Sequence, residues 1–481
     1  MHKNAILPRI AGLIMLLCAT VQMEADKRII LLADIHVMGP SLLDSSDNIA
    51  WQEELADHRK MQDLSVPIFD LLIERIISEK PDLLFICGDL TKDGEQESHE
   101  YVQNKLTEVK DAGIRVYVIP GNHDLDQPEA ARIYADNTYT AATSYTDEMF
   151  RETYKDFGYG EDSEIHPSSH SYSTELFPGL TLLGIDTGHT AHVRERNIPW
   201  ITQEARKAHD RGNQILVMAH HSLIPHFYNQ ESFMVNSVID THEQLRDSLM
   251  AAGVKVVLTG HYHISDNTRY TNDQGQEIYD ICTGSPLSYP CDYRILTFDD
   301  QFKQLKITTE SVTELEGYDD FPGYAKSRLQ SAFQRWATNW FKERSVDEAI
   351  TSMMSQSIAD VYTIHAEGNE PQNPASSEAV ALYDDIITLS PLFEGDFADK
   401  ITELSLSMKS MLGDYPSIEE ADNIVDDREL TITMPVLSTG IRQIENHDRF
   451  DTPWYTLQGL RLQGKPTKPG IYIHNSVLVN I

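Results

Sequence analysis

Five short motifs, each rich in aspartate, asparagine or histidine, lie between residues 34 and 263 of this sequence. In chain order they are Asp34-Ile35-His36, Gly88-Asp89 with Asp93-Gly94 behind it, Gly121-Asn122-His123-Asp124, His220-His221 and Gly260-His261-Tyr262-His263. Carboxylates and amides offer oxygen to a metal ion and imidazoles offer nitrogen, a mixture that suits Zn, Mn or Fe better than Ca or Mg alone. The motifs therefore indicate a transition-metal site.

Each motif closely follows a short apolar run of the kind that forms a β-strand. These runs cover residues 28–33, 83–87, 116–119, 215–219 and 254–258, and a further run at 180–184 carries no motif. Amphipathic stretches at 66–78, 95–112 and 202–211 alternate with the runs, which predicts an α/β domain. Ligands of open α/β sheets bind beyond the carboxyl ends of the strands. We therefore expect the five motifs to meet at one edge of the sheet.

The pattern changes along the rest of the chain. A polar, tyrosine-rich stretch at 135–173 is expected to be a surface insertion, and 294–311 a hairpin. Helical periodicity follows at 324–343, 346–365, 376–387 and 397–411, before β-like runs return at 430–435 and 470–474. We predict a signal peptide at 1–25, the α/β domain at 26–316, a helical domain at 317–425 and a short β-rich tail at 426–481.

The motifs resemble, in content and order, the signature of the calcineurin-like metallophosphoesterase superfamily. That signature, D-x-H, G-D-x-x-x-D-G, G-N-H-D, H and G-H-x-H, extends here over most of residues 28–311. The resemblance implies a four-layer α/β/β/α sandwich with two metal ions at the strand ends. It also implies hydrolysis of phosphate mono- or diesters, and it points to the bacterial branch that contains cyclic-nucleotide phosphodiesterases and related exported phosphoesterases.

The resemblance implies a ligand set for two divalent transition-metal ions, Mn, Zn or Fe. One ion is expected to bind Asp34, His36 and His263, the other Asn122, His220 and His261, with the carboxylate of Asp89 bridging both.

The fourth motif departs from the family pattern. The family usually has H-x-P where this chain has His220-His221-Ser222, and the alignment favours His220 as the ligand. His221 and His226 are then candidates for contact with the substrate, or simply polar residues of the loop.

The third motif supplies the expected proton donor. His123 matches a histidine that the family holds near the metals, and Asp124 matches its orienting partner. Two metal ions can clamp a phosphoryl group and lower the pKa of a bridging water, whose hydroxide attacks phosphorus in line. The leaving alkoxide needs a proton, which an imidazole can supply near neutral pH.

The charge of the chain narrows the choice of partners. Its 481 residues contain 39 Lys+Arg and 75 Asp+Glu, a formal net charge of −36. A surface this negative repels phosphate backbones and anionic headgroups, which argues against nucleic-acid and membrane-surface partners. A nuclease of the same superfamily is therefore the weaker alternative. A non-catalytic binding protein on the same fold is also disfavoured, because every ligand position is filled.

Both ends of the chain carry patterns of exported proteins. Lys3 and Arg9 precede an apolar run at 10–23 that is shorter than the roughly 20 residues of a membrane-spanning helix. We therefore predict a signal peptide, an extracytoplasmic location and no membrane span in the mature chain. A lipoprotein with an acylated Cys18 at its mature N-terminus is an alternative. At the other end, residues 454–473 resemble the terminal sorting signals of exported Gram-negative proteins, although a simple hairpin is an alternative.

Two further expectations concern packing. Trp336, Trp340 and Phe341 form an aromatic stripe on one expected helix, and such a stripe must be buried. We expect the helical region to pack on the α/β domain and to shape the approach to the metals, with an independent dimerisation or spacer module as the alternative. Cys282 and Cys291 either form a disulfide or remain two free thiols.

Overall fold

The computed structural model describes residues 26–392, 396–413, 421–423, 426–436, 454–456, 462, 466, 468, 471–474 and 477–480. The predicted signal peptide and Cys18 lie outside these residues, as does much of the predicted tail. The described pieces of the tail include β17 (Trp454–Thr456), β18 (Ile471–His474) and β19 (Val477–Asn480), which form a three-stranded antiparallel sheet.

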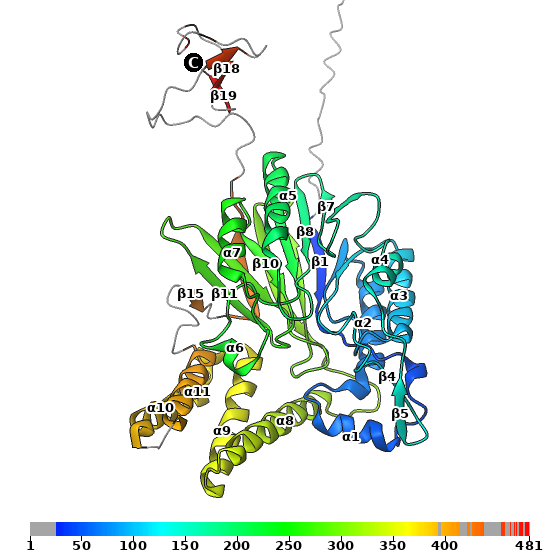
Figure 1. The fold of residues 1–481 in the computed structure, drawn as a ribbon, viewed down its shortest axis with the longest axis vertical. Coiled ribbons are helices and arrows are strands. Elements are labelled where there is room, and N and C mark those ends of the chain that lie inside the picture. The colour runs from blue at the N-terminus through cyan, green and yellow to red at the C-terminus, as the bar shows by residue number, and fades with distance from the viewer. Residues whose placement is uncertain are drawn as a thin grey trace, which may run out of the picture.

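Two mixed β-sheets form the centre of the molecule (Figure 1). The first has the order β16-β14-β13-β1-β2-β3 and consists of β1 (Lys27–Leu32), β2 (Leu83–Cys87), β3 (Arg115–Ile119), β13 (Asp292–Phe298), β14 (Gln304–Ser311) and β16 (Glu429–Thr433). The second has the order β15-β11-β12-β10-β9-β8-β7-β6 and consists of β6 (Ser163–Ile165), β7 (Tyr172–Phe177), β8 (Leu180–Ile185), β9 (Gln214–Ala219), β10 (Val256–Thr259), β11 (Asp266–Thr271), β12 (Glu277–Cys282) and β15 (Ala421–Asn423). The strands that carry the motifs are parallel to their motif-bearing neighbours within each sheet.

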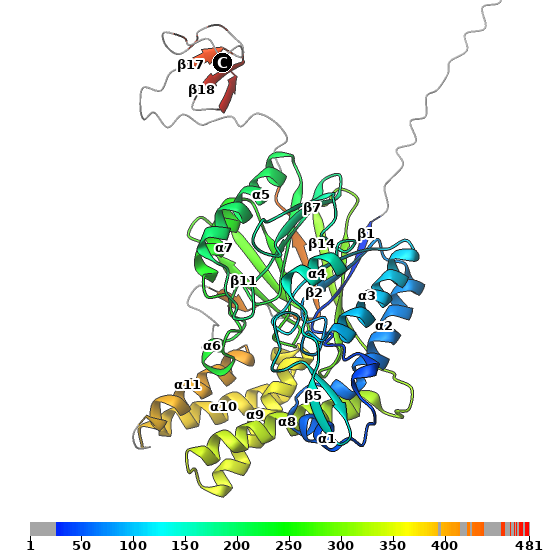
Figure 2. The same cartoon turned by 45° about the vertical axis from the view of Figure 1, so that its right-hand side comes forward.

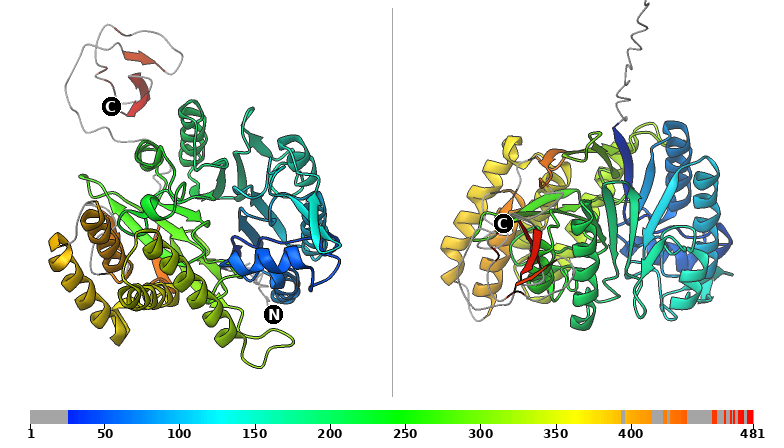
Figure 3. Two further views of the ribbon diagram at one scale, coloured as in Figure 1. Left: turned by 60° about the horizontal axis from the view of Figure 1, so that its bottom comes forward. Right: turned by 90° about the horizontal axis from the view of Figure 1, so that it is seen from above.

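The sheets pack face to face because their strands are apolar on both sides. In β9, Leu216 and Met218 join the core between the two sheets, whereas Ile215 and Val217 pack on the helical side. Helices α5 (Ile198–Asp210) and α7 (His242–Ala251) cover that outer face, and α2 (Ser65–Glu79) and α3 (Gln96–Asp111) cover the outer face of the first sheet (Figure 3). This is the predicted four-layer α/β/β/α sandwich.

The helical region consists of α8 (Phe321–Glu343), α9 (Glu348–Glu367), α10 (Pro374–Leu389) and α11 (Phe397–Met411). It lies below the sheets, beside α6 (Gln230–Phe233) and α1 (Ile49–Asp57) (Figure 2). Phe333 and Phe341 of α8 share an apolar core with Phe227, Tyr262 and Ile264 of the α/β domain. The expected packing on that domain is therefore confirmed. Among the described helices, none combines the length and the apolar character that crossing a bilayer requires.

After the helical region the chain returns to both sheets. Strand β15 pairs with β11 and strand β16 with β14, both antiparallel. The predicted boundaries place these strands in the helical domain and the tail. Edge pairing is decided by segments far apart in the sequence, so a local apolar pattern could not assign β15 and β16 to these sheets.

The stretch at 135–173, predicted as a surface insertion, contributes β6 and the start of β7 to the second sheet and buries Phe150, Tyr154 and Phe157 in the core. Strands β4 (Arg132–Ala135) and β5 (Thr138–Ala141) form a hairpin at its start, followed by α4 (Asp147–Thr153). The predicted hairpin at 294–311 is present as β13 and β14. Cys282 and Cys291 are buried free thiols, so the structure contains no disulfide between them.

Candidate metal centre

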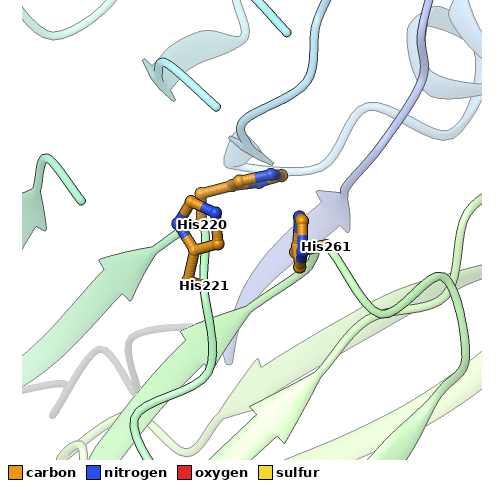
Figure 4. A group of neighbouring side chains, drawn as sticks. All are labelled: His220, His221 and His261. Carbon is orange, nitrogen blue, oxygen red and sulfur yellow. The ribbon is translucent and has the colours of Figure 1, made fainter. Parts of the chain in front are cut away.

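The carboxyl ends of five strands bring the predicted metal ligands together. Asp34 and His36 follow β1, Asp89 follows β2, Asn122 follows β3, His220 and His221 follow β9, and His261 and His263 follow β10. Figure 4 shows the rings of His220, His221 and His261 gathered at the ends of their strands.

One group of donors consists of Asp34, His36, Asp89 and His263, whose ligand atoms all lie within 4.8 Å of one another. The Nε2 atom of His36 is 3.1 Å from Nε2 of His263 and 3.5 Å from Oδ2 of Asp89. The Nε2 atom of His263 is 3.3 Å from Oδ1 of Asp34. This is the set that the sequence predicts for the first metal ion.

The second group consists of His220, His221 and His261, again with ligand atoms within 4.8 Å of one another. The Nε2 atom of His220 lies 3.0 Å from Oδ1 of Asn122 and 3.3 Å from Oδ2 of Asp89. Asp89 is therefore in contact with both groups through a single oxygen. We expected only one of His220 and His221 to face the centre, but the structure brings both of them to it.

Hydrogen bonds behind the rings fix which nitrogen faces the centre. The carbonyl of Cys87 accepts a hydrogen bond from Nδ1 of His220 at 2.7 Å, which leaves the lone pair of Nε2 for a ligand. Nδ1 of His221 lies 2.6 Å from the hydroxyl of Thr187. Nε2 of His221 and Oδ1 of Asp34 are buried without any hydrogen-bond partner. Such orphaned acceptors fit bound metal ions, which would complete their coordination.

The backbone is strained where the donors sit. Asp34, His36, Asp89, His261 and His263 have φ values of +53°, +37°, +49°, +66° and +67°. Residues with a side chain enter this left-handed region at a cost of about 1–2 kcal/mol each. The surrounding sandwich holds five of the seven predicted ligands in this conformation, a concentration of strain that is characteristic of functional sites.

Two glycines make room for the carboxylates of the centre. A Cβ atom at Gly121 would lie 2.2 Å from Oδ1 of Asp89, and one at Gly260 would lie 2.7 Å from Oδ2 of Asp34. Gly121, the first residue of the third motif, and Gly260, the first residue of the fifth, are therefore required because a carboxylate lies where a side chain would be.

The electrostatics of the centre favour bound cations. Burial lowers the pKa of His36, His261 and His263, so these imidazoles are neutral and have free lone pairs. For His220, burial opposes a charged ring, but the Asp89 carboxylate outweighs it and raises the pKa to about 9. Asp89 thus draws positive charge to the point where the two donor groups meet. Together with the mixed nitrogen and oxygen donors, this fits two divalent transition-metal ions.

His123 lies at the edge of the centre with a third of its side chain exposed. Oδ1 of Asp93 accepts a hydrogen bond from its Nδ1 at 2.9 Å. We predicted Asp124 as the orienting partner, but the carboxylate of Asp124 accepts hydrogen bonds from the backbone N–H groups of Leu90, Thr91 and Gly121. Asp124 therefore ties the second motif to the third, and Asp93 orients the ring. The G-D-x-x-x-D-G spacing had already singled out Asp93.

His226 is not at the substrate side of the centre. It is buried, with Nδ1 3.2 Å from Oδ1 of Asp266 and Nε2 3.6 Å from Oδ1 of Asp280. Asp266 also lies 3.4 Å from His365 of α9, whose other ring nitrogen contacts Glu370 at 2.7 Å. We call these five residues the α9 cluster. It joins the helical region to the second sheet, so His226 has a structural environment.

A cleft of about 450 Å³ opens onto the donors. Its lining includes Asp89, His123, His261 and His263, and also two cations that the sequence did not single out, Arg59 and Lys60. Nζ of Lys60 lies 3.0 Å from Nδ1 of His36, and burial lowers the pKa of this lysine to about 8. No motif marks these cations, because they come from the segment after α1 and reach the centre only through the fold.

Comparison with known proteins agrees with the geometry. Residues 27–265 match the model of the calcineurin-like phosphoesterase family, and this part of the chain belongs to that family. The serine/threonine-protein phosphatases CPPED1 of Homo sapiens and Bos taurus are 26% and 23% identical to it over 211 and 208 residues. Each alignment covers 41% of this chain and 58% of the relative, so the chain spans less than two thirds of these curated relatives.

Two solved structures are similar to this chain. A dimetal phosphatase from Danio rerio is 13% identical, with a TM-score of 0.42, and the match covers 60% of this chain and 97% of that one. A purple acid phosphatase from seeds of yellow lupin, Lupinus luteus, is 14% identical, also with a TM-score of 0.42, and covers 62% of this chain and 53% of that one.

Proposed function

We propose that this protein is a metal-dependent phosphoesterase that hydrolyses phosphate mono- or diesters. The observation that carries the proposal is the position of Asp89, whose Oδ2 atom is within 3.5 Å of His36 Nε2 in one donor group and of His220 Nε2 in the other. A carboxylate shared by two converging donor groups is the arrangement of a two-metal site. Such ions, when bound, polarise a phosphoryl group and lower the pKa of a water molecule toward neutrality.

The proposed division of labour follows from the contacts. Asp34, His36, Asp89 and His263 would hold one ion, and Asp89, Asn122, His220 and His261 the other, with the free Nε2 of His221 as a further donor.

His123 would donate a proton to the leaving oxygen from Nε2. Because Asp93 accepts the hydrogen bond from Nδ1, it orients the ring and leaves Nε2 as the nitrogen available for proton transfer.

We further propose that the protein is exported and works outside the cytoplasm, in the manner of the bacterial branch that its motifs resemble. The support lies in the sequence, in Lys3, Arg9 and the apolar run at 10–23. N-terminal sequencing of protein from the native host should give a start near Asp26. Intact Met1 on cytoplasmic protein would contradict export, and an acyl group on Cys18 would indicate a lipoprotein.

The proposed activity is tested by removing and restoring metal. Protein treated with EDTA should lose hydrolysis of both p-nitrophenyl phosphate and bis(p-nitrophenyl) phosphate, whichever it prefers, and regain it with Mn or Zn. Plasma emission spectroscopy should find close to two ions per chain in the active form. An active protein that holds no metal and ignores EDTA would overturn the proposal. A plasmid-nicking assay run in parallel should remain negative because of the net charge of −36.

A further inference from the structure

The cleft beside the donors has two chemically different walls. Arg59 and Lys60 are the cations of its lining. Phe233, Met234, Val235, Ile264, Leu329 and Phe333 provide its apolar lining. These apolar residues come from three places, namely the end of α6 and the residues after it, the loop after β10, and α8 of the helical region.

The two cations lack carboxylate partners. Lys60 is 7% exposed, and its Nζ atom lies 3.0 and 3.2 Å from the ring nitrogens of His36. Arg59 is exposed, and its guanidinium carbon lies 5.6 Å from the ring centre of Phe333. Within the described part of the chain, no carboxylate lies within 4.0 Å of either group. In a protein with 75 acidic and 39 basic residues, two such cations side by side are unexpected unless an anion meets them.

The charges already present do not account for these cations. Asp34 and Asp89 belong to the metal donors, and Asp93 lies between His123 and Lys92. The positive charges of Arg59 and Lys60 are therefore left for whatever enters the cleft. A phosphate monoester carries close to two negative charges at neutral pH, because its second pKa is about 6, whereas a diester carries one. Two extra cations match the monoester better.

The apolar wall fits the other end of such a molecule. Val235 is 76% exposed at the cleft, and Phe233 and Met234 are half-buried beside it. Contact between apolar side chains and a phosphate group is not favourable. Contact with an apolar leaving group is favourable, because it removes apolar surface from water on both sides. A sugar or glycerol leaving group would instead require hydrogen-bonding side chains. Beside the metal donors and His123, the cleft offers such groups at His58, Tyr262 and Ser288, whereas the apolar residues above offer none.

We infer that the substrate is a phosphate monoester with an apolar leaving group. Its phosphate lies against Lys60 and Arg59 beside the metal donors, and its leaving group lies against the wall that α8 and residues 233–235 form. The inference rests on the proposed phosphoesterase function and deepens it. Lys60 and Arg59 select the charge of the substrate, and the helical region selects its leaving group.

Binding of non-hydrolysable analogues tests both parts without turnover. Isothermal titration calorimetry on the metal-loaded protein would compare phenylphosphonate, methylphosphonate and the monoanionic methyl ester of phenylphosphonate. Phenylphosphonate should bind at least about tenfold more tightly than either of the others, because it alone combines two negative charges with an apolar group. Equal affinities for phenyl- and methylphosphonate would overturn the apolar wall, and equal affinities for phenylphosphonate and its ester would overturn the charge match.

Matched variants locate the two effects. Lys60→Met should weaken phenylphosphonate about 10- to 100-fold, and Lys60→Arg should restore most of that loss. Lys105→Met, which removes a cation paired with Asp70 on the outer side of the first sheet, should change nothing. Val235→Asp should abolish the preference for phenyl over methyl, whereas Ile350→Asp, at an exposed apolar residue outside the cleft, should not. If Lys60→Met binds as well as wild type, the phosphate lies elsewhere.

Hydrolysis separates this inference from the proposed function. The metal-loaded protein should cleave p-nitrophenyl phosphate faster than bis(p-nitrophenyl) phosphate, and hexyl phosphate faster than glycerol phosphate. If it holds metal and cleaves esters but prefers diesters or glycerol phosphate, the inference fails and the phosphoesterase function stands. If no ester is cleaved and no metal is bound, the proposed function itself fails.

Discussion

Two buried clusters of histidine and carboxylate lie near each other in this protein, and their chemistry is opposite. In the metal centre, the rings of His36 and His263 direct their nitrogens toward each other and toward Asp34 and Asp89. In the α9 cluster, His226 lies between Asp266 and Asp280, and His365 lies between Asp266 and Glu370. Both clusters combine buried imidazoles with carboxylates.

Their protonation separates them. Burial lowers the pKa of His36, His261 and His263, so these rings remain neutral. Burial acts in the same direction on His226, but the carboxylates of Asp266 and Asp280 outweigh it and raise the pKa to about 10. A charged ring between carboxylates has no lone pair for a metal, whereas a neutral ring with a free nitrogen has one. In the metal centre His220 is the exception, because the Asp89 carboxylate raises its pKa to about 9. His36, His261 and His263 stay neutral because burial outweighs the carboxylates around them.

The largest effect should come from Asp89, the residue common to both donor groups. Asp89→Ala should lower the metal content below one ion per chain and reduce hydrolysis to the level of EDTA-treated protein. The reason is that the loss of a bridging ligand weakens the binding of both ions. The damage should exceed that of Asp34→Ala, which touches one ion. Metal analysis and p-nitrophenyl phosphate hydrolysis on the same samples measure this. If Asp89→Ala retained two ions, Asp89 would not be a ligand of both, and the proposed difference between the metal centre and the α9 cluster would be wrong.

His123 combines a feature of each cluster. It lines the cleft at the metal centre, and its Nδ1 is hydrogen-bonded to a carboxylate, as the nitrogens of the α9 cluster are paired with carboxylates. His123→Ala should keep its metal and lose about 10²- to 10⁴-fold in rate on alkyl phosphates, whose leaving oxygen needs a proton. The loss should shrink for p-nitrophenyl phosphate, because that phenolate leaves unaided. His261→Ala is the matched control and should lose metal. Equal losses for every leaving group would remove His123 from the role of proton donor.

Asp266 should matter to folding and leave the metal centre intact. Asp266→Ala removes the carboxylate that contacts both His226 and His365 but leaves Asp280 and Glu370 in place. The loss of stability should therefore be smaller than the about 3–5 kcal/mol typical of a buried charge left without any partner. Urea unfolding followed by circular dichroism measures this change in the free energy of unfolding. The folded variant should still bind close to two ions. A loss of metal with unchanged stability would mean that the α9 cluster belongs to the metal centre.

The smallest expected effect is on the pH dependence of stability. The pKa of His226 is raised from 6.5 to about 10 in the folded protein. Its contribution to stability is therefore complete below pH 6.5, declines as pH rises, and is lost near pH 10. The stability difference between wild type and His226→Gln should be larger at pH 6.5 than at pH 9. A difference that grows with pH would show that the ring is neutral in the folded state.

The sequence and the structure agree most closely at the metal donors. Asp34, Asp89, Asn122 and His261 were identified from motifs that directly follow strands, and local order along the chain is sufficient to place such residues at a sheet edge. The role expected of Asp124 was wrong in its contacts. Asp124 is next to His123 in the sequence, but its carboxylate accepts hydrogen bonds from backbone N–H groups, whereas Asp93, 30 residues before His123, is brought to the ring by the fold. Of the two interpretations open for His226, the structure favours a polar residue of the loop, since its partners Asp266 and Asp280 lie on β11 and β12, far from it in the sequence.

The sequence by itself therefore indicated an α/β domain, a helical region and the clustering of the motifs at one sheet edge, because strand patterns and the residues at strand ends are local properties. The four-layer sandwich and the assignment of ligands came from the resemblance of the motifs to a family, and His221 was added by the structure. The tertiary structure alone decided that β15 and β16 complete the two sheets and that Lys60 reaches His36. It alone decided that Phe333 of α8 forms part of the wall of the cleft. These contacts join segments that are distant in sequence, and their formation depends on how complete elements pack together, which no local pattern records.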